Sequence, residues 1–219
     1  MKNWIQLEQP VVTEVNSLQK DLKIPHFICS LLLQRGVNSL NKAKLFFRPE
    51  LGSLHDPYLM KDMEKAVVRI NNSSSEKIMI LGDYDVDGAA AAAMLYKWFN
   101  NFKLKPTIYI PDRDKEGYGP NNKAMTKLSL KHDLIICVDC GSTADIPIKN
   151  AKKNSCSVIV IDHHQGGDKN TKADALVNPN RVDEKSELKF LCAAGVTFLL
   201  LVALNRELKK YGRELRLFP

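Results

Sequence analysis

The stretch IMILGDYDVDG, residues 78–88, decides the fold. Its first four residues form an uninterrupted apolar run, which is typical of a strand in a parallel sheet covered on both faces. Similar runs recur at 107–110, 134–138 and 158–161, and segments long enough for a crossover helix separate them, at about 89–99, 122–130 and 143–153. Alternating strands and helices predict an α/β fold built on a doubly wound, mostly parallel sheet.

Acidic or imidazole side chains follow three of these apolar runs, where each strand is expected to end. They are Asp83, Asp85 and Asp87, then Asp139, and then Asp162, His163 and His164. If strand geometry continues past residue 82, the first three aspartates point in one direction. Converging carboxylates repel one another unless cations neutralise them, and a mixture of oxygen and nitrogen ligands favours Mn²⁺ or a similar ion.

Each acidic cluster alone also fits a helix cap or a turn. Three clusters at the same edge of one sheet favour a metal site instead, because ligands of such sheets bind outside the carboxyl ends of the strands. Two ions there could clamp a phosphate and activate water. The sequence therefore predicts hydrolysis of a phosphodiester or a phosphoanhydride. A dinucleotide-binding fold of the Rossmann type is disfavoured, because no G-x-G-x-x-G follows the first strand.

Five motifs in this order resemble those of the DHH phosphoesterase superfamily, and in particular its RecJ family of single-strand-specific 5′→3′ exonucleases. They are GDYDVDG at 82–88, PDRDKEGYG at 111–119, VDCG at 138–141, VIDHH at 160–164 and VNPNR at 177–181. The resemblance begins near Leu45 and continues to the end of the chain. It implies a DHH domain that hydrolyses phosphodiester bonds of single-stranded DNA in repair and recombination, with two Mn²⁺ or Mg²⁺ ions.

The same resemblance implies a role for each candidate residue. Metal ligands would be Asp83, Asp85, Asp87, Asp139 and His163. Catalysis would use Asp139 as well, together with His164 facing the scissile phosphate and Asp162 orienting the histidine ligand by hydrogen bonding. A substrate loop would be formed by Arg113, Lys115, Tyr118 and Gly119, in which a guanidinium can hold phosphate oxygens.

Members of this family carry one more motif, known as the fourth, which contains a further metal-binding aspartate. It follows the helix expected here at about 190–210, and further domains follow it. The chain is thus expected to be the N-terminal part of such an enzyme, with a second polypeptide as a candidate source of the missing lobe. Ala89 and Ala90 also stand where the family usually carries hydroxyl residues. Two alternatives stay open: a catalytically weak or inactive nucleic-acid-binding remnant, and a phosphodiesterase acting on short oligonucleotides or cyclic dinucleotides.

The sequence before the first strand predicts a small N-terminal helical segment, residues 1–72, followed by a C-terminally incomplete DHH domain, residues 73–219. Helix-like spacing covers 25–34 and 37–47. A third helix is predicted from apolar residues spaced three or four positions apart, namely Met60, Met63, Val67 and Ile70. Its apolar face should pack on the sheet. A polar connector at 71–75 marks the predicted boundary.

The composition fits an intracellular protein with a polyanionic partner. The 219 residues are 44% hydrophobic, enough for one substantial core, and the net charge of +7 favours a polyanionic partner, which the resemblance identifies as single-stranded DNA. A polar start and the absence of a long apolar run predict neither a secretory signal nor a membrane span. Five cysteines suit a reducing cytoplasm. Cys137 and Cys140 form a C-x-x-C pair, which could hold zinc, but without a second pair packing is the preferred interpretation.

Overall fold

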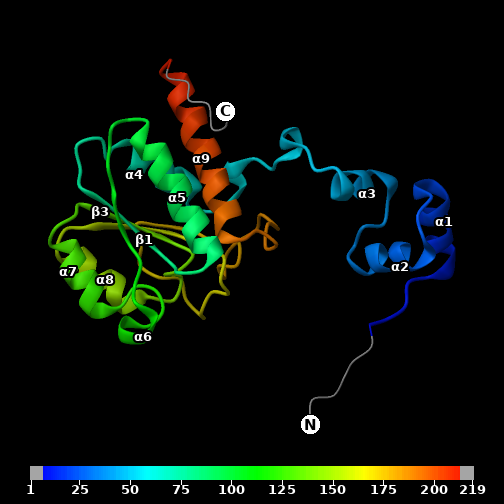
Figure 1. Ribbon diagram of the computed structural model, residues 1–219, viewed down its shortest axis with the longest axis horizontal. Coiled ribbons are helices and arrows are strands. Elements are labelled where there is room, and N and C mark those ends of the chain that lie inside the picture. Colours follow the sequence, from blue (N-terminus) through cyan, green and yellow to red (C-terminus); the bar gives the residue numbers. More distant parts are fainter. Residues whose placement is uncertain (1–6, 213–219) are drawn as a thin grey trace, which may run out of the picture. The chain divides into compact units, whose positions relative to one another are not determined.

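The structure is a computed structural model that describes residues 7–212, drawn in Figure 1. Residues 1–6 and 213–219, including the end of the predicted DHH domain, lie outside the described residues. The chain divides into two compact units between His55 and Asp56.

The first unit is helical. It contains α1 (Val12–Leu22), α2 (His26–Gln34), α3 (Leu40–Phe47) and the short 3₁₀ turn η1 (Leu51–Ser53). A small core joins the helices, formed by Val15, Leu18, Cys29, Leu32, Val37 and Ala43. Ser39 caps α3 by accepting a hydrogen bond from the backbone N–H of Lys42. The helices expected at 25–34 and 37–47 are therefore present, whereas α1 was not predicted.

The second unit is built on a parallel sheet, as predicted. Its strands are β1 (Ile78–Gly82), β2 (Thr107–Tyr109), β3 (Leu134–Val138), β4 (Ser157–Ile161) and β5 (Ala175–Val177), paired in the order β2-β1-β3-β4-β5. Every pair is parallel. The short β5 was not predicted, because three apolar residues give no pattern that distinguishes a strand.

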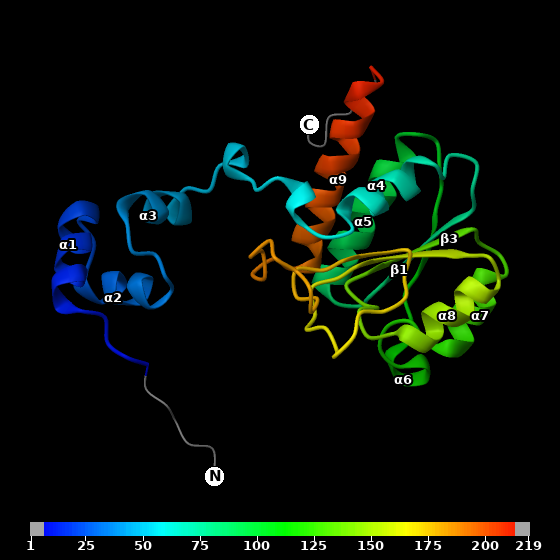
Figure 2. The same cartoon turned by 180° about the vertical axis from the view of Figure 1, so that it is seen from behind.

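Helices cover both faces of this sheet (Figures 1 and 2). One face packs on α4 (Met63–Asn71), α5 (Val86–Asn100) and α9 (Ala193–Lys210), and the other on α7 (Asn122–Ser129) and α8 (Asp145–Lys153). Side chains along β1 alternate between the two cores, with Ile78 and Ile80 on the first and Met79 and Leu81 on the second. The strands are apolar throughout because both of their faces are buried.

The helix α4 belongs to the sheet unit, since it packs against β5 and α9. The predicted packing of Met60, Met63, Val67 and Ile70 on the sheet is confirmed, because all four join its core. The division of the chain at residue 55 consequently falls earlier than the boundary predicted at 72. The remaining short elements of this unit are η2 (Pro57–Leu59) and α6 (Arg113–Glu116).

The strand order places a topological switch point between β1 and β3. From β1 the chain crosses to β2 on one side, and it returns to β3 on the other side of β1. The loops that leave the carboxyl ends of β1 and β3 therefore separate, and a crevice that can hold a ligand is expected there. Asp83 follows β1 and Asp139 follows β3 at this point. None of the helices in residues 7–212 is long and apolar enough to cross a membrane.

Candidate metal centre

The turn from β1 into α5 positions the first acidic cluster. The strand ends at Gly82, and Asp85 caps α5 by accepting a hydrogen bond from the Gly88 backbone N–H at 2.9 Å. The turn is tight: a Cβ on Gly88 would lie 2.7 Å from the Asp83 carbonyl oxygen. The expectation that Asp83, Asp85 and Asp87 continue a strand and share one direction is wrong, because Asp87 already lies in the first turn of α5.

Asp139 is the most unusual side chain of the site. It follows β3 with a left-handed backbone, φ +61°, and is 1% exposed. Within the described residues, neither of its carboxylate oxygens accepts a hydrogen bond. Burial raises its pKa from 3.8 to about 8, aided by the nearby carboxylates of Asp87 and Asp85. A buried carboxylate that accepts no hydrogen bond is costly in a folded protein, and a cation bound beside it would lower that cost.

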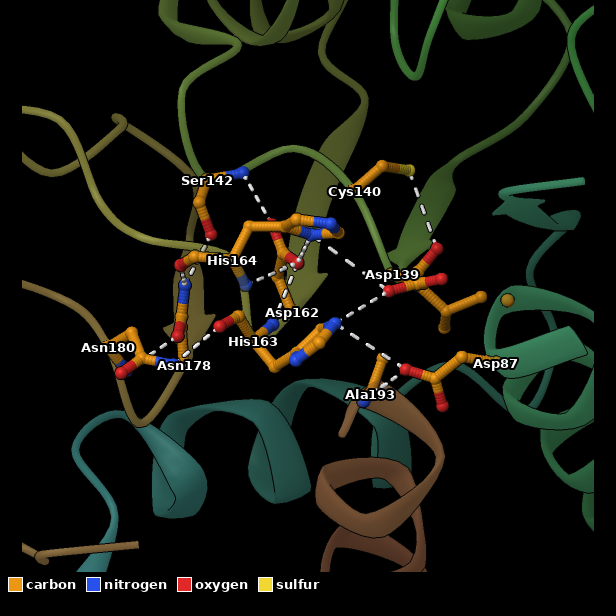
Figure 3. Close-up of polar contacts among 12 residues, drawn as sticks. Asp87, Asp139, Cys140, Ser142, Asp162, His163, His164, Asn178, Asn180 and Ala193 are labelled. Carbon is orange, nitrogen blue, oxygen red and sulfur yellow. Dashed lines mark hydrogen bonds and ion pairs between the residues drawn. The ribbon is translucent and has the colours of Figure 1, made fainter. Parts of the chain in front are cut away.

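Two groups of ligand atoms share Asp139, shown in part in Figure 3. Oxygens of Asp83 and Asp85 lie within 4.8 Å of one another and of an oxygen of Asp139. Ring nitrogens of His163 and His164 form a second group with an oxygen of Asp139, within the same distance of one another. Burial raises the pKa of Asp83, while the bond from the Gly88 amide lowers that of Asp85. Hard oxygen donors combined with imidazole fit Mn²⁺ and also admit Mg²⁺. The donor set therefore fits the ions expected from the sequence.

Asp162 fixes the histidine pair. Its Oδ1 accepts hydrogen bonds from the backbone N–H groups of His163 and His164, at 2.7 and 3.2 Å, and approaches His164 Nδ1 at 2.8 Å. Its Oδ2 accepts from the Ser142 backbone N–H. Burial opposes ionisation, but the bonds from His164 and Ser142 outweigh it and lower the pKa of Asp162 to about 2. The carboxylate in turn raises the pKa of His164. Asp162 thus contacts the ring of His164 but only the backbone of His163, whereas the sequence predicted that it orients His163.

His163 lies between two carboxylates. Its Nε2 is 3.3 Å from Asp139 Oδ1 and 3.5 Å from Asp87 Oδ2 (Figure 3). Asp87 itself accepts hydrogen bonds from the backbone N–H groups of Ala193 and Ala194 at the start of α9. The sequence placed Asp87 among the metal ligands, and the structure also gives it these two partners.

The loop expected to bind substrate touches the acidic cluster through Tyr118. The Tyr118 hydroxyl donates to the Asp139 carbonyl oxygen at 2.8 Å and lies 3.2 Å from His164 Nδ1. Gly119 has a φ of +67°, and a Cβ there would lie 3.2 Å from Cys140 Cβ. A glycine thus lets this loop approach the strand end closely enough for Tyr118 to reach the site.

The two basic residues of the loop contact their own surroundings. The Arg113 guanidinium lies 5.0 Å from the centre of the Tyr84 ring, a cation–π contact beside the first acidic cluster. Lys115 Nζ forms an exposed ion pair with Asp112 at 3.2 Å. Arg113 is therefore the better placed of the two to meet a phosphate near Asp83.

Three polar residues that the sequence did not single out hold the histidine segment. Asn180 and Asn178 donate from their side-chain amides to the backbone carbonyls of His163 and His164 respectively, and Asn178 also donates to the Ser142 hydroxyl. Asn178 is fully buried. Both asparagines belong to VNPNR, so the motif was visible in the sequence, but only the structure shows which groups it supports.

Cys137 and Cys140 are both free and fully buried. Both pack in the core formed with α7 and α8, as predicted.

Known proteins share this sequence pattern. A profile described as DHH family, N-terminal domain, matches residues 77–217. The chain is similar to the single-stranded-DNA-specific exonuclease RecJ of Bacillus subtilis (strain 168), with 37% identity over 206 residues, which are 93% of this chain and 26% of that protein. It is also similar to the exonuclease of the same name from Escherichia coli (strain K12), with 32% identity over 97% of this chain and 36% of that protein. The chain spans 26% and 36% of the length of these two curated relatives.

Solved structures share the fold. RecJ in complex with Mn²⁺ from Thermus thermophilus aligns with 93% of this chain and 28% of its own, at 25% identity and a TM-score of 0.70. A crystal structure of exonuclease RecJ bound to manganese aligns with 68% of this chain and 38% of its own, at 30% identity and a TM-score of 0.63.

Proposed function

This chain belongs to the DHH family, and we propose that it is a metal-dependent phosphodiesterase of the RecJ type. Its substrate would be single-stranded DNA, shortened from the 5′ end in repair and recombination in the cytoplasm. The names of its relatives support this substrate, and so does its net charge of +7, which favours a polyanion.

The observation that carries the proposal is the carboxylate of Asp139. It is buried at the switch point of the sheet, it accepts no hydrogen bond from the residues described, and carboxylates and imidazoles surround it. An N-cap or a turn, the alternative interpretation of the sequence, would give this carboxylate backbone partners. The nearest nitrogen, Nε2 of His163, lies 3.3 Å from its Oδ1, and a cation shared by these two groups would stabilise the carboxylate.

Asp83, Asp85, Asp87, Asp139 and His163 would hold Mn²⁺ or Mg²⁺ in the proposed enzyme. A divalent cation at such a site polarises phosphate oxygens and lowers the pKa of water. Asp139 takes part in both groups of ligand atoms, so its substitution would affect both.

His164 would act on the substrate phosphate. The hydrogen bond with Asp162 holds a proton on its Nδ1 and keeps the ring charged to a higher pH, which suits it to stabilise negative charge on phosphate oxygens. Tyr118 contacts the same ring and limits its movement. Arg113 would hold a phosphate on the side of Asp83, with Lys115 and Gly119 shaping the loop.

The proposal is tested with purified protein, a 5′-phosphorylated single-stranded oligonucleotide and increasing Mn²⁺. We expect metal-dependent shortening from the 5′ end, its loss in Asp139→Asn, and its retention in Asp168→Asn, which alters an exposed aspartate in the loop after the histidine pair. Turnover in Asp139→Asn equal to the wild type would refute the assignment.

A panel of substrates separates the remaining alternatives. Hydrolysis of short oligonucleotides or cyclic dinucleotides, but not of longer strands, would assign the enzyme to another DHH activity. Salt-sensitive DNA binding and Mn²⁺ binding without turnover would identify a binding module instead. Adding the remaining part of a relative as a second polypeptide would then show whether a missing lobe restores turnover.

A further inference from the structure

Lysines gather on one part of the surface, the two helices α7 and α8. The segments 122–131 and 145–153, which contain these helices, hold six lysines and one aspartate, a net charge of +5. The whole chain has a net charge of +7, so its positive charge is concentrated there. All six are exposed: Lys123, Lys127, Lys131, Lys149, Lys152 and Lys153. We call the surface that they form the lysine face.

The lysine face is one continuous surface, because α7 and α8 lie side by side (Figures 1 and 2). Asn150 of α8 donates to the side-chain oxygen of Asn122 at the start of α7, at 3.3 Å. At the other end of α7, the Asn154 side-chain amide donates to the Ser129 hydroxyl at 2.8 Å. Lys153 Nζ donates to the Asn150 side-chain oxygen, so a lysine of α8 reaches the junction between the two helices.

Most lysines of this face are not neutralised by the protein itself. Two are paired, Lys149 with Asp145 and Lys152 with Asp174, each at 2.6 Å. The other four form no ion pair within residues 7–212, namely Lys123, Lys127, Lys131 and Lys153. Like charges four residues apart, as at 123 and 127, destabilise a helix slightly. A polyanion bound across the face would replace this repulsion by attraction.

The lysine face begins beside the loop expected to bind substrate. Asn121 caps α7 by accepting a hydrogen bond from the Ala124 backbone N–H, and its side-chain amide donates to the Glu116 carbonyl of that loop. Lys123 follows in the first turn of α7, and α8 begins soon after Asp139. Helices that connect parallel strands run back along the sheet, so both lead away from the edge that carries the metal centre.

We propose that the lysine face binds the phosphodiester backbone of single-stranded DNA outside the metal centre. The choice of DNA rests on the proposed function, because a strand held at the metal centre has to leave it along the neighbouring surface. Its backbone carries a negative charge at every nucleotide, which complements the lysines. Neither segment contains Phe, Tyr or Trp, on which unpaired bases stack, so the face contacts phosphates and does not read bases.

Fluorescence anisotropy with labelled oligo(dT) tests the proposal in the presence of a chelator, so that the metal centre neither holds nor cuts the strand. A variant that combines Lys127→Gln, Lys131→Gln and Lys153→Gln removes three phosphate contacts. Each contact contributes about 0.7 to the slope of log affinity against log salt, so the slope should fall by about 2. At about 0.1 M salt, affinity should fall about a hundredfold. Arginine at the same three positions should keep affinity within about threefold.

A matched control removes the same charge elsewhere. Lys20→Gln, Lys44→Gln and Lys97→Gln combined alter three exposed lysines outside the lysine face, and affinity should stay within about threefold of the wild type. Oligo(dA) should bind as tightly as oligo(dT). Equal losses in the two glutamine variants, or a wild type without salt-sensitive binding, would overturn the proposal. Poly-glutamate binding more tightly than DNA would also overturn it and identify an acidic protein as the partner.

The outcome is separate from that of the proposed function. Chelator-independent binding through the lysine face, in a protein that does not cleave DNA with Mn²⁺, would refute the proposed function and support the lysine face. Cleavage with Mn²⁺, together with wild-type affinity in the Lys127, Lys131 and Lys153 glutamine variant, would do the reverse.

Discussion

Replacing Asp139 by asparagine should stabilise the metal-free protein near pH 7. Most substitutions of a fully buried residue destabilise, so the sign of this effect is diagnostic. The reason lies in the raised pKa of the Asp139 carboxyl group, which burial and the carboxylates of Asp87 and Asp85 produce. Asparagine has nearly the same shape and is uncharged at every pH, so it keeps the packing and, unlike the aspartate, does not have to bind a proton when the protein folds near pH 7.

The magnitude follows from proton linkage. The pKa of Asp139 is raised from 3.8 to about 8 in the folded state. Below about pH 4 the group is protonated in both the folded and the unfolded state, and its contribution to stability is fully present. As the pH rises, the unfolded state loses the proton first, so the unfolding free energy falls by about 1.4 kcal/mol for each pH unit until about pH 8. About three units separate pH 4 from pH 7, which gives about 4 kcal/mol.

Urea denaturation of both proteins in the presence of a chelator measures this difference. The gap between Asp139→Asn and the wild type should be small near pH 4 and grow toward pH 7, and the contributions of groups unaffected by the substitution cancel in the comparison. Added Mn²⁺ should stabilise the wild type alone and reduce or reverse the gap. A variant that is less stable than the wild type near pH 7, or a gap independent of pH, would refute the account of Asp139 as a buried carboxyl group with a raised pKa.

Three further substitutions have expected outcomes. Tyr118→Phe removes the bond to the Asp139 carbonyl, so kcat should fall about tenfold with little change in KM, whereas a rise confined to KM would indicate direct substrate contact instead. Asn180→Ala frees the His163 carbonyl, and calorimetry should show Mn²⁺ affinity about tenfold weaker. Gly88→Ala places a Cβ 2.7 Å from the Asp83 carbonyl oxygen, so denaturation should show a loss of about 2 kcal/mol or more; unchanged stability would mean that the turn can open.

The sheet was predictable because its strands are buried on both faces. Uninterrupted apolar runs at 78–81, 134–138 and 158–161 match β1, β3 and β4 to within a residue. The polar residue after each run marks the edge at which the site forms. In contrast, β5 has only three residues and α1 has only two fully buried ones, so neither gave a clear periodic signal.

The candidate site was predictable as a set of residues but not as a set of contacts. Asp83, Asp85, Asp139 and the histidine pair do converge, because the parallel strands bring their carboxyl ends together. The hydrogen bond from the Ala193 backbone N–H to Asp87 was not predictable, because the two residues are far apart in the sequence and no motif spacing connects them. The support from Asn178 and Asn180 was hidden for the same reason.

Asp162 explains why the DHH triplet is contiguous, whereas other ligands of the same site are scattered along the chain. Its Oδ1 accepts from the backbone N–H groups of the next two residues and meets the ring of the second, so both histidines are held by the residue that immediately precedes them. One residue inserted after Asp162 would shift both histidines out of reach of that oxygen. The spacing of carboxylates from different strands can vary with loop length, but these three residues can change only by substitution. The segment from Asp162 to His164 is thus expected to tolerate insertions less than the loops between strands do.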